Sequence, residues 1–221
     1  MTLMSFVLAA VVVAVWYFPG ARQRPGAGSS AAAQARRLRT PLVRLADLVG
    51  IQTARGRQAQ QWAAGAAGER ATAARLQVLV RQGWIVLHDR ALLTGQANVD
   101  HLLISPGGVV FVLDSKLWSS RYLLRIVGGR LLHGSRDVTS RLNGIRHEAR
   151  AVSKALGCPV IPIVSMEGAP LADDELVLDG IRIVPADQAV AVLRSIARRH
   201  RAVGEHPGQR AGALFKPYRR T

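Results

Sequence analysis

The segment 98–116, NVDHLLISPGGVVFVLDSK, decides the fold expected for this chain. Two apolar runs, 102–104 and 109–113, flank a Pro-Gly-Gly turn, a pattern typical of a β-hairpin. Charged residues seldom lie inside such strands, because a buried carboxylate without a partner is costly. This hairpin nevertheless carries Asp100 on its first strand and Asp114 and Lys116 on its second.

The length of the turn sets which residues of the hairpin face each other. If a three-residue loop closes it, Ser105 pairs with Val109, and Asp100 lies opposite Asp114 at a Cβ separation of roughly 5 Å. Lys116 shares the face of Asp114, because side chains two residues apart in a strand point the same way. Adjacent carboxylates repel each other unless a cation neutralises them, and hard oxygen ligands suit Mg²⁺ or Mn²⁺. A lysine beside such a metal can orient a water or stabilise a phosphate oxyanion, so the pattern indicates a metal-dependent phosphodiesterase.

An ordinary structural role is the alternative for these charges. Asp100 could cap a turn, and Asp114 with Lys116 could form an ion pair on a solvated edge strand, where charged residues are common. An isolated Asp-x-Lys would be interpreted in that way. The segments that surround the hairpin change the interpretation here.

A helix is predicted upstream of the hairpin, through GAAGER at 65–70 and on to about Gln82. Residues at spacings of three and four form one stripe along it: Trp62, Ala66, Glu69, Ala73, Leu76 and Val80. Glu69 lies in this stripe among apolar neighbours. It could form a salt bridge with Arg70 or Arg75, or it could face the same pocket as the hairpin carboxylates. The segment GWIVLH at 83–88 then predicts a strand after a glycine stop.

Taken in order, these segments resemble the NERD domain, the nuclease-related domain. The resemblance covers roughly residues 65–165, continues weakly to about 196, and rests on four blocks: G-x-x-G-E-R at 65–70, G-W-x-V-L-H-D at 83–89, N-V-D-H-L-L-I at 98–104 and G-G-V-V-F-V-L-D-S-K-L-W at 107–118. It implies a core similar to the PD-(D/E)xK restriction-endonuclease-like fold.

The resemblance also implies roles for individual residues. Glu69 matches the helix glutamate of the family, Asp100 its first strand acid, and Asp114 and Lys116 its (D/E)-x-K pair. The implied metal ligands are Asp100, Asp114 and Glu69, and the implied cofactor is Mg²⁺ or Mn²⁺. The family usually has Glu at the position of Asp114 and often Gln at that of Asn98, and the shorter Asp side chain shifts the expected metal geometry. Because many endonuclease-like domains dimerise, a homodimer is a further expectation.

The N-terminus predicts a transmembrane anchor over residues 1–19. Residues 3–18 are apolar apart from Ser5 and end in three aromatic residues, typical of a membrane interface. With the first two residues, the run approaches the lower limit of about 17 residues for a span. A cleaved signal peptide is the alternative, but no Lys or Arg precedes the apolar run and no clear A-x-A site follows it. Arginines follow the run, so we expect a single-pass protein of the cell membrane, its N-terminus outside and its main domain cytoplasmic.

Composition favours a polyanionic partner. The chain has 30 Lys and Arg residues against 14 Asp and Glu, a formal net charge of +16, which suits DNA, RNA or anionic lipid. Its single cysteine, Cys158, excludes an internal disulfide and fits a reducing compartment. The sequence contains neither a CxxC nor an HExxH motif, so a structural zinc site is not expected.

Composition shifts divide the chain into four parts. We expect the anchor at 1–19, a flexible basic linker at 20–57 with a short helix near 42–51, a compact domain at 58–196 and a mobile basic tail at 197–221. Beyond the first hairpin, the domain shows the following predicted elements: strands at 122–127 and 130–133, a helix at 138–156, an apolar central strand at 160–164, a strand at 181–184 and a helix at 186–196. This order predicts an α/β fold, a mixed central β-sheet flanked by helices.

The helix at 138–156 carries Arg146, Arg150 and Lys154 on one face at spacings of four. This face is either simply solvated or a ridge that contacts phosphates of nucleic acid. His101 is expected to point to the opposite side of the sheet from Asp100, as a packed histidine. We therefore expect a membrane-anchored nuclease that hydrolyses DNA or RNA. The alternative is a non-catalytic module that binds nucleic acid or anionic lipid with the same basic surface.

Overall fold

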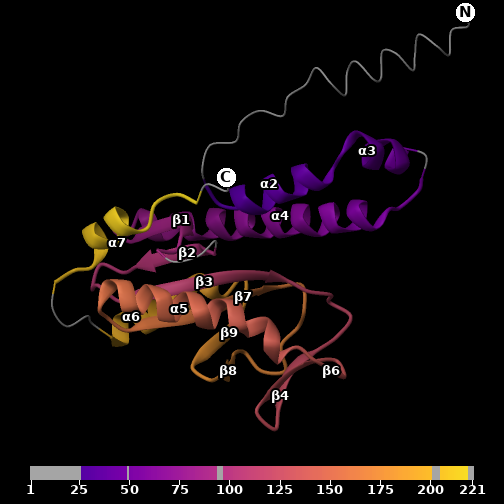
Figure 1. Ribbon diagram of the computed structural model, residues 1–221. Coiled ribbons are helices and arrows are strands. Elements are labelled where there is room, and N and C mark those ends of the chain that lie inside the picture. The colour runs from indigo at the N-terminus through magenta and orange to yellow at the C-terminus, as the bar shows by residue number, and fades with distance from the viewer. Residues whose placement is uncertain (1–25, 49, 94–96, 201–204, 219–221) are drawn as a thin grey trace, which may run out of the picture.

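The computed structural model describes residues 26–48, 50–93, 97–200 and 205–218, and a mixed β-sheet lies at its centre (Figure 1). The sheet has the strand order β1-β2-β3-β7-β9-β8, formed by β1 (Ile85–Ala91), β2 (Asn98–Ile104), β3 (Val110–Leu117), β7 (Val160–Glu167), β9 (Ile181–Pro185) and β8 (Leu176–Leu178). The pairs β3–β7 and β7–β9 are parallel, and the others are antiparallel. The prediction of a mixed central sheet flanked by helices is therefore confirmed, and the apolar strand predicted at 160–164 is central.

The hairpin β2–β3 has the predicted register. The backbone N–H of Ser105 donates to the carbonyl of Val109 at 2.9 Å, and His101 pairs with Leu113. One step further along this register, Asp100 lies opposite Asp114. The Pro-Gly-Gly turn thus sets the placement of the two acids, as a one-residue slip would move one of them to the other face.

Helices cover both faces of the sheet. The long helix α4 (Ala54–Val80) and α6 (Ala189–Arg199) pack on the face that carries Leu103 and Phe111. Helix α5 (Asn143–Leu156), which follows the short 3₁₀ helix η1 (Thr139–Leu142), packs on the face that carries Leu102 and Val112. The alternation of buried side chains along β2 and β3 supplies an apolar surface to each layer.

A small second sheet lies beyond the end of β3. It consists of β4 (Leu124–Val127), β5 (Arg130–His133) and β6 (Arg136–Asp137), all antiparallel. The strands predicted at 122–127 and 130–133 are present as the antiparallel pair β4–β5, with β4 beginning two residues later than expected. Strand β8 and the two-residue β6 were not expected from the sequence.

Helix α4 differs in detail from the predicted stripe. Ala66, Glu69 and Leu76 are buried as expected, whereas Trp62 is 39% exposed and Val80 41% exposed. Trp62 lies in the N-terminal half of α4, where the buried residues are the small Gly56, Ala59 and Ala66. Val80 is the last residue of the helix, and Leu79 is buried beside the sheet in its place.

The segment predicted as a flexible linker differs from that expectation. Residues Ser29–Leu38 form helix α2, which packs along α4 through the buried Ala31 and Ala35, and Pro41–Leu48 form α3, close to the short helix expected there (Figure 1). The small side chains of Ala31 and Ala35 let α2 approach α4 closely, so this part of the expected linker is an ordered helix.

The tail also packs where mobility was expected. Gly208–Leu214 form helix α7, and Phe215 is fully buried in the core beside α5. The backbone N–H of Ala91 donates to the carbonyl of Lys216 at 2.9 Å, so the tail pairs with the edge strand β1. The buried Phe215 and this backbone hydrogen bond together hold this end of the chain on the domain.

The predicted membrane anchor at 1–19 lies outside the described residues. Within the residues that the structure describes, no helix is both long enough and apolar enough to cross a bilayer.

Candidate active site

Two acidic side chains come together where β2 and β3 run side by side. Asp114 is only 4% exposed, and its Oδ2 lies 2.5 Å from the Nζ of Lys116. Burial lowers the pKa of Lys116, but the charge and hydrogen bond of Asp114, together with the charges of Asp100 and Glu148, outweigh this effect, and the net pKa is raised. Lys116 is therefore charged, and the predicted Asp-x-Lys pair is a close ion pair.

Asp100 is held beside this pair. Burial of its carboxyl group, followed by the charge of Asp114, holds its pKa well above the usual range. Glu69 and Glu148 add to the same effect, and Lys116 opposes it. The predicted neighbours Asp100 and Asp114 therefore share one electrostatic environment.

Glu69 reaches the same cluster from α4. It is buried, and burial together with the nearby Asp89 raises its pKa to about 7. The backbone N–H of Gly28 donates a hydrogen bond to it and partly opposes that shift. The alternative partner Arg75 instead forms an ion pair with Glu167 at 2.7 Å. The structure thus brings Glu69, Asp100, Asp114 and Lys116 together.

Sequence reasoning missed a fourth carboxylate, Glu148 on α5. Burial and the charge of Asp114 raise its pKa to about 8, with Lys116 acting in the opposite direction. A signal was present in the sequence, because Glu148 is the sole acid of a basic helix and lies among Ile145, Ala149 and Val152, which are buried. An acid on the apolar side of a helix is the same pattern that singled out Glu69.

Asp89 is a further acid that the sequence did not single out. Its register position on β1 is opposite Asp100, since His88 pairs with His101 and Arg90 with Val99. Its φ of 49° is in the left-handed region, which Asp tolerates better than most residues. The carboxylate accepts hydrogen bonds from Ser29 Oγ, from the Ser30 N–H at 2.8 Å and from Asn98 Nδ2 at 2.9 Å. It therefore ties the start of α2 to the sheet.

The donor set fits a hard divalent cation. Oε2 of Glu69 and Oε2 of Glu148 are both buried without a hydrogen-bond partner, and such oxygens are rarely left unsatisfied. Carboxylate oxygens are the ligands that Mg²⁺ and Mn²⁺ prefer. Across the described residues, however, no three His, Cys, Asp or Glu side chains are close enough to hold a metal as they stand. Binding of a cation would therefore require rotation of these side chains, including separation of Asp114 from Lys116.

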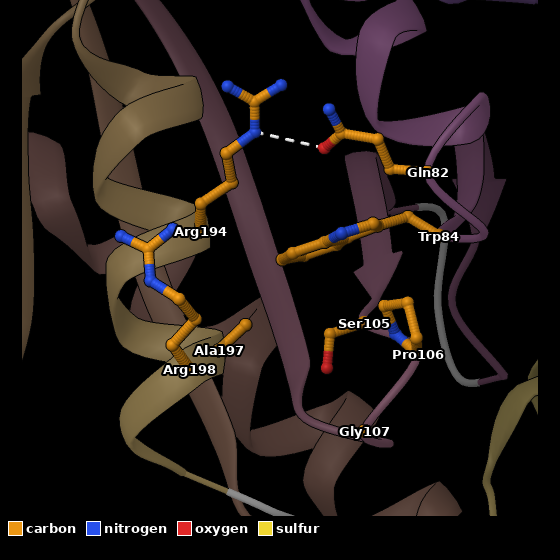
Figure 2. A pocket seen from close by; sticks show the side chains of 8 residues that line it. All are labelled: Gln82, Trp84, Ser105, Pro106, Gly107, Arg194, Ala197 and Arg198. Carbon is orange, nitrogen blue, oxygen red and sulfur yellow. Dashed lines mark hydrogen bonds between the residues drawn. The ribbon is translucent and has the colours of Figure 1, made fainter.

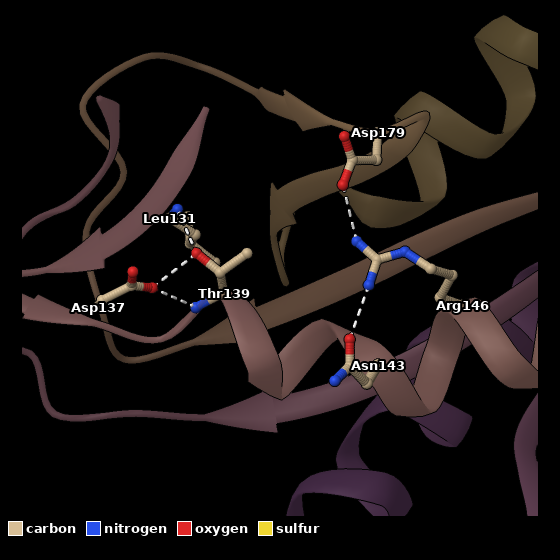
Figure 3. Close-up of polar contacts among 6 residues, drawn as sticks. All are labelled: Leu131, Asp137, Thr139, Asn143, Arg146 and Asp179. Atoms are coloured by element: carbon tan, nitrogen blue, oxygen red, sulfur yellow. Dashed lines mark hydrogen bonds and ion pairs between the residues drawn. The ribbon is translucent and has the colours of Figure 1, made fainter. Parts of the chain in front are cut away.

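The three basic residues predicted to contact nucleic acid lie together. Arg146, Arg150 and Lys154 line one face of a pocket of about 660 Å³ between α5 and the strands β7 and β9. Arg146 differs from its neighbours, because its guanidinium donates to Asn143 Oδ1 at 2.7 Å and to Asp179 Oδ2 at 2.8 Å (Figure 3). Arg150 and Lys154 are exposed.

A second pocket, of about 610 Å³, lies at the turn end of the hairpin. Trp84, Pro106 and Arg198 contribute to its lining, and Arg194 Nε donates to Gln82 Oε1 at 3.0 Å on its rim (Figure 2). No acidic residue lines this pocket. It is therefore separate from the carboxylate cluster.

His101 faces away from the acids, as expected. It is fully buried, its Nδ1 lies 2.8 Å from that of His88, and its Nε2 lies 3.4 Å from Ser115 Oγ. Burial, followed by the charge of His88, lowers the pKa of His101 to about 3. Its role is packing and hydrogen bonding within the core.

The fold and the cluster define an α/β domain whose central hairpin gathers several carboxylates around one lysine. Residues 64–166, from α4 through β7, match the family described as the nuclease-related domain, NERD. This range agrees with the resemblance expected over roughly 65–165, and it indicates a nuclease-related function. No curated protein and no solved structure gives a significant match to the chain.

Proposed function

We propose that this domain is a divalent-metal-dependent phosphodiesterase that hydrolyses DNA or RNA. One observation carries the proposal: acids from four elements, α4, β2, β3 and α5, converge on Lys116, and two of their buried oxygens lack a partner. A cluster of buried acids lowers the stability of the fold, because buried like charges repel, so a purely structural role does not explain it. The match to a nuclease-related domain supports the same conclusion.

Each residue of the cluster has a role in this proposal. Asp100 and Asp114 would hold Mg²⁺ or Mn²⁺, with Glu69 as a third ligand, directly or through water. The bound cation would supply charge stabilisation at the phosphate and lower the pKa of a water molecule. The Lys116 ammonium would position the attacking water or stabilise a phosphate oxygen on which negative charge develops. Glu148, with its pKa of about 8, would hold a proton beside the cluster near neutral pH.

The substrate class follows from charge. A net charge of +16 favours a polyanion, and Arg150 and Lys154 offer exposed cations on the helix that also carries Glu148. We further propose, from the apolar run at 3–18, that the chain is anchored at the cell membrane with this domain in the cytoplasm. A homodimer is retained as an expectation from the resemblance.

A cleavage assay tests the proposal. The full chain would be incubated with labelled single- and double-stranded DNA and RNA, with Mg²⁺ or Mn²⁺ and separately with EDTA. Asp114→Asn should lower metal-dependent cleavage by at least about 100-fold, whereas Asp174→Asn, at an exposed acid outside the cluster, should leave it unchanged. Equal cleavage by the two variants would refute the assignment.

A non-catalytic binding module is the second candidate, and two observations favour it. Asp114 is already neutralised by Lys116, and the acids form no ready three-ligand group among the described residues. Metal stabilisation separates the two functions. A metal site would make Mn²⁺ raise the melting temperature of the full chain and Asp100→Ala remove that gain, whereas a binding module would show neither effect.

A further inference from the structure

An exposed apolar surface is formed by α3 and by Ile51, three residues after the end of that helix. Leu42, Leu45 and Leu48 are 79%, 56% and 70% exposed, and Ile51 is 60% exposed. We refer to these four residues as the α3 strip. The three leucines recur every third residue, so they lie on one side of the helix, while Val43 on another side is buried. Four large exposed apolar side chains in ten residues are unusual for a surface that meets only water.

Arginines flank the α3 strip in the sequence. The segment 36–57 contains six of them, all exposed, against the single acid Asp47: Arg36, Arg37, Arg39, Arg44, Arg55 and Arg57. The partner of the α3 strip must therefore accept apolar side chains at its centre and positive charge around them.

This combination selects among possible partners. A second copy of the chain would bring one set of arginines against another, and like charges at an interface are unfavourable. A nucleic acid would pair with the arginines but leave the leucines in water. An anionic bilayer satisfies both, because leucines enter the acyl region while arginines remain at the headgroups.

The position of α3 in the chain and in the fold agrees with such a partner. Residues 3–18 form an apolar run in the sequence, and only residues 19–40 lie between that run and the start of α3. Helix α3 lies at the end of the α2–α4 pair that is farthest from the central sheet (Figure 1). A membrane bound there would not cover the carboxylate cluster.

We propose that the α3 strip docks on the surface of an anionic membrane. The leucines and Ile51 insert at the level of the headgroups, and the arginines bind lipid phosphates. This contact is separate from the anchor expected at 1–19, and it does not depend on the proposed catalytic activity. It would hold α3 against the bilayer and so orient the whole domain relative to the membrane.

A site-specific probe tests the docking. The single native cysteine is removed by Cys158→Ser, and an environment-sensitive fluorophore is attached to the full chain through Leu48→Cys. The matched control carries the same probe through Val127→Cys on β4, a residue that is 50% exposed. Because the apolar run at 3–18 would hold the chain on any bilayer, the readout is the environment of the probe rather than co-sedimentation.

The proposal makes a specific expectation for vesicles of phosphatidylcholine mixed with phosphatidylglycerol. The probe at position 48 should shift to shorter wavelength and be quenched by a lipid-attached quencher, and the probe at 127 should do neither. Replacing Arg44 and Arg55 by Gln should reduce the quenched fraction severalfold. A probe at 48 that stays in water on these vesicles overturns the proposal. A shift that occurs without vesicles when the protein concentration is raised also overturns it and indicates a second copy as the partner. A shift that occurs without vesicles when an oligonucleotide is added overturns it as well and indicates nucleic acid.

Discussion

The ammonium of Lys116 lies 2.5 Å from Oδ2 of Asp114, so these two residues of the candidate site neutralise each other. Both come from β3, two residues apart, and their close contact follows from their shared face of the strand. In the proposed reaction the Asp114 carboxylate would hold a cation. Lysine and metal therefore compete for one carboxylate.

This competition predicts that Lys116→Met separates metal binding from cleavage. Removing the ammonium frees Asp114 and removes a positive charge next to the cation, so Mn²⁺ should raise the melting temperature at least as much as in the native chain. Cleavage should nevertheless fall by about 100-fold or more, because the group that positions water or stabilises the phosphate is gone. Calorimetry and a cleavage assay on the same preparation provide the test. A variant that loses the Mn²⁺ effect would show that Lys116 supports the metal site instead of competing with it.

The acids of the cluster predict a decline in stability as pH rises when metal is absent. Glu69 and Glu148 ionise near pH 4.5 in the unfolded chain, but their folded-state pKa values are about 7 and about 8. Between these limits the folded chain binds more protons than the unfolded chain, so a rise in pH favours unfolding. Urea unfolding in EDTA from pH 6.5 to pH 8, above the ordinary pKa of 6.5 of histidine, should show a falling free energy of unfolding.

Glu148→Gln should make this decline in the free energy of unfolding shallower, by up to about 1.4 kcal/mol per pH unit. The reason is that glutamine does not titrate, so unfolding of the variant releases one proton fewer. Asp174→Asn is the matched control and should leave the slope unchanged. An identical slope in Glu148→Gln and the native chain would mean that Glu148 is not held protonated by the cluster.

The buried histidine pair predicts an opposite effect at acidic pH. His101 has a folded-state pKa of about 3, against an ordinary value of 6.5. Its stabilising contribution is present above pH 6.5 and is lost as the pH falls, because the unfolded chain takes up a proton that the folded chain excludes. The destabilisation caused by His101→Gln at pH 7 should therefore become smaller as the pH falls from about 6.5 to 4. Urea unfolding of the variant and the native chain over this range measures the difference. A difference in the free energy of unfolding that does not change with pH would contradict the assignment.

Asp89 predicts a link between α2 and the rest of the fold. Asp89→Ala removes the acceptor for Ser29, Ser30 and Asn98, and hydrogen bonds to a charged group contribute about 1.5–3 kcal/mol. We expect the free energy of unfolding to fall by about that amount and trypsin to cleave earlier at Arg36 or Arg37. The exposed Asp174→Ala should change neither quantity. Unchanged proteolysis of Asp89→Ala would show that α2 is held by its packing on α4 alone.

The basic face of α5 predicts an unequal effect of its three cations on nucleic-acid binding. Replacing Arg150 and Lys154 together by Gln should weaken binding and reduce the salt dependence of the affinity by about two units of slope. Arg146→Gln should have less effect, because Asp179 already pairs with its guanidinium at 2.8 Å. Conversely, Asp179→Asn should strengthen binding by freeing Arg146. Titrations at several salt concentrations give the slopes, and equal losses for all three cations would mean that the Asp179 pair does not persist on nucleic acid.

The sequence alone determined the local elements of the core and the hairpin chemistry. The apolar runs on either side of the turn at 106–108 set the strands and their register, and this register places Asp100 opposite Asp114. The acid at position 69 was recognisable because it interrupts an apolar helix stripe. These features depend on residues close together in the chain, where spacing translates directly into a shared face.

Only the tertiary structure decided which distant residues join them. Glu148 enters the cluster because α5 packs on the face of the sheet that carries Asp100 and Asp114. Asp89 holds α2 because that helix starts beside β1, the edge strand of the sheet. Likewise, Phe215 is buried only because the tail returns to β1, and Asp179 pairs with Arg146 across 33 positions of sequence. Such contacts depend on how layers stack and loops close. Their partners are therefore set by long-range packing, which the local spacing of residues does not specify.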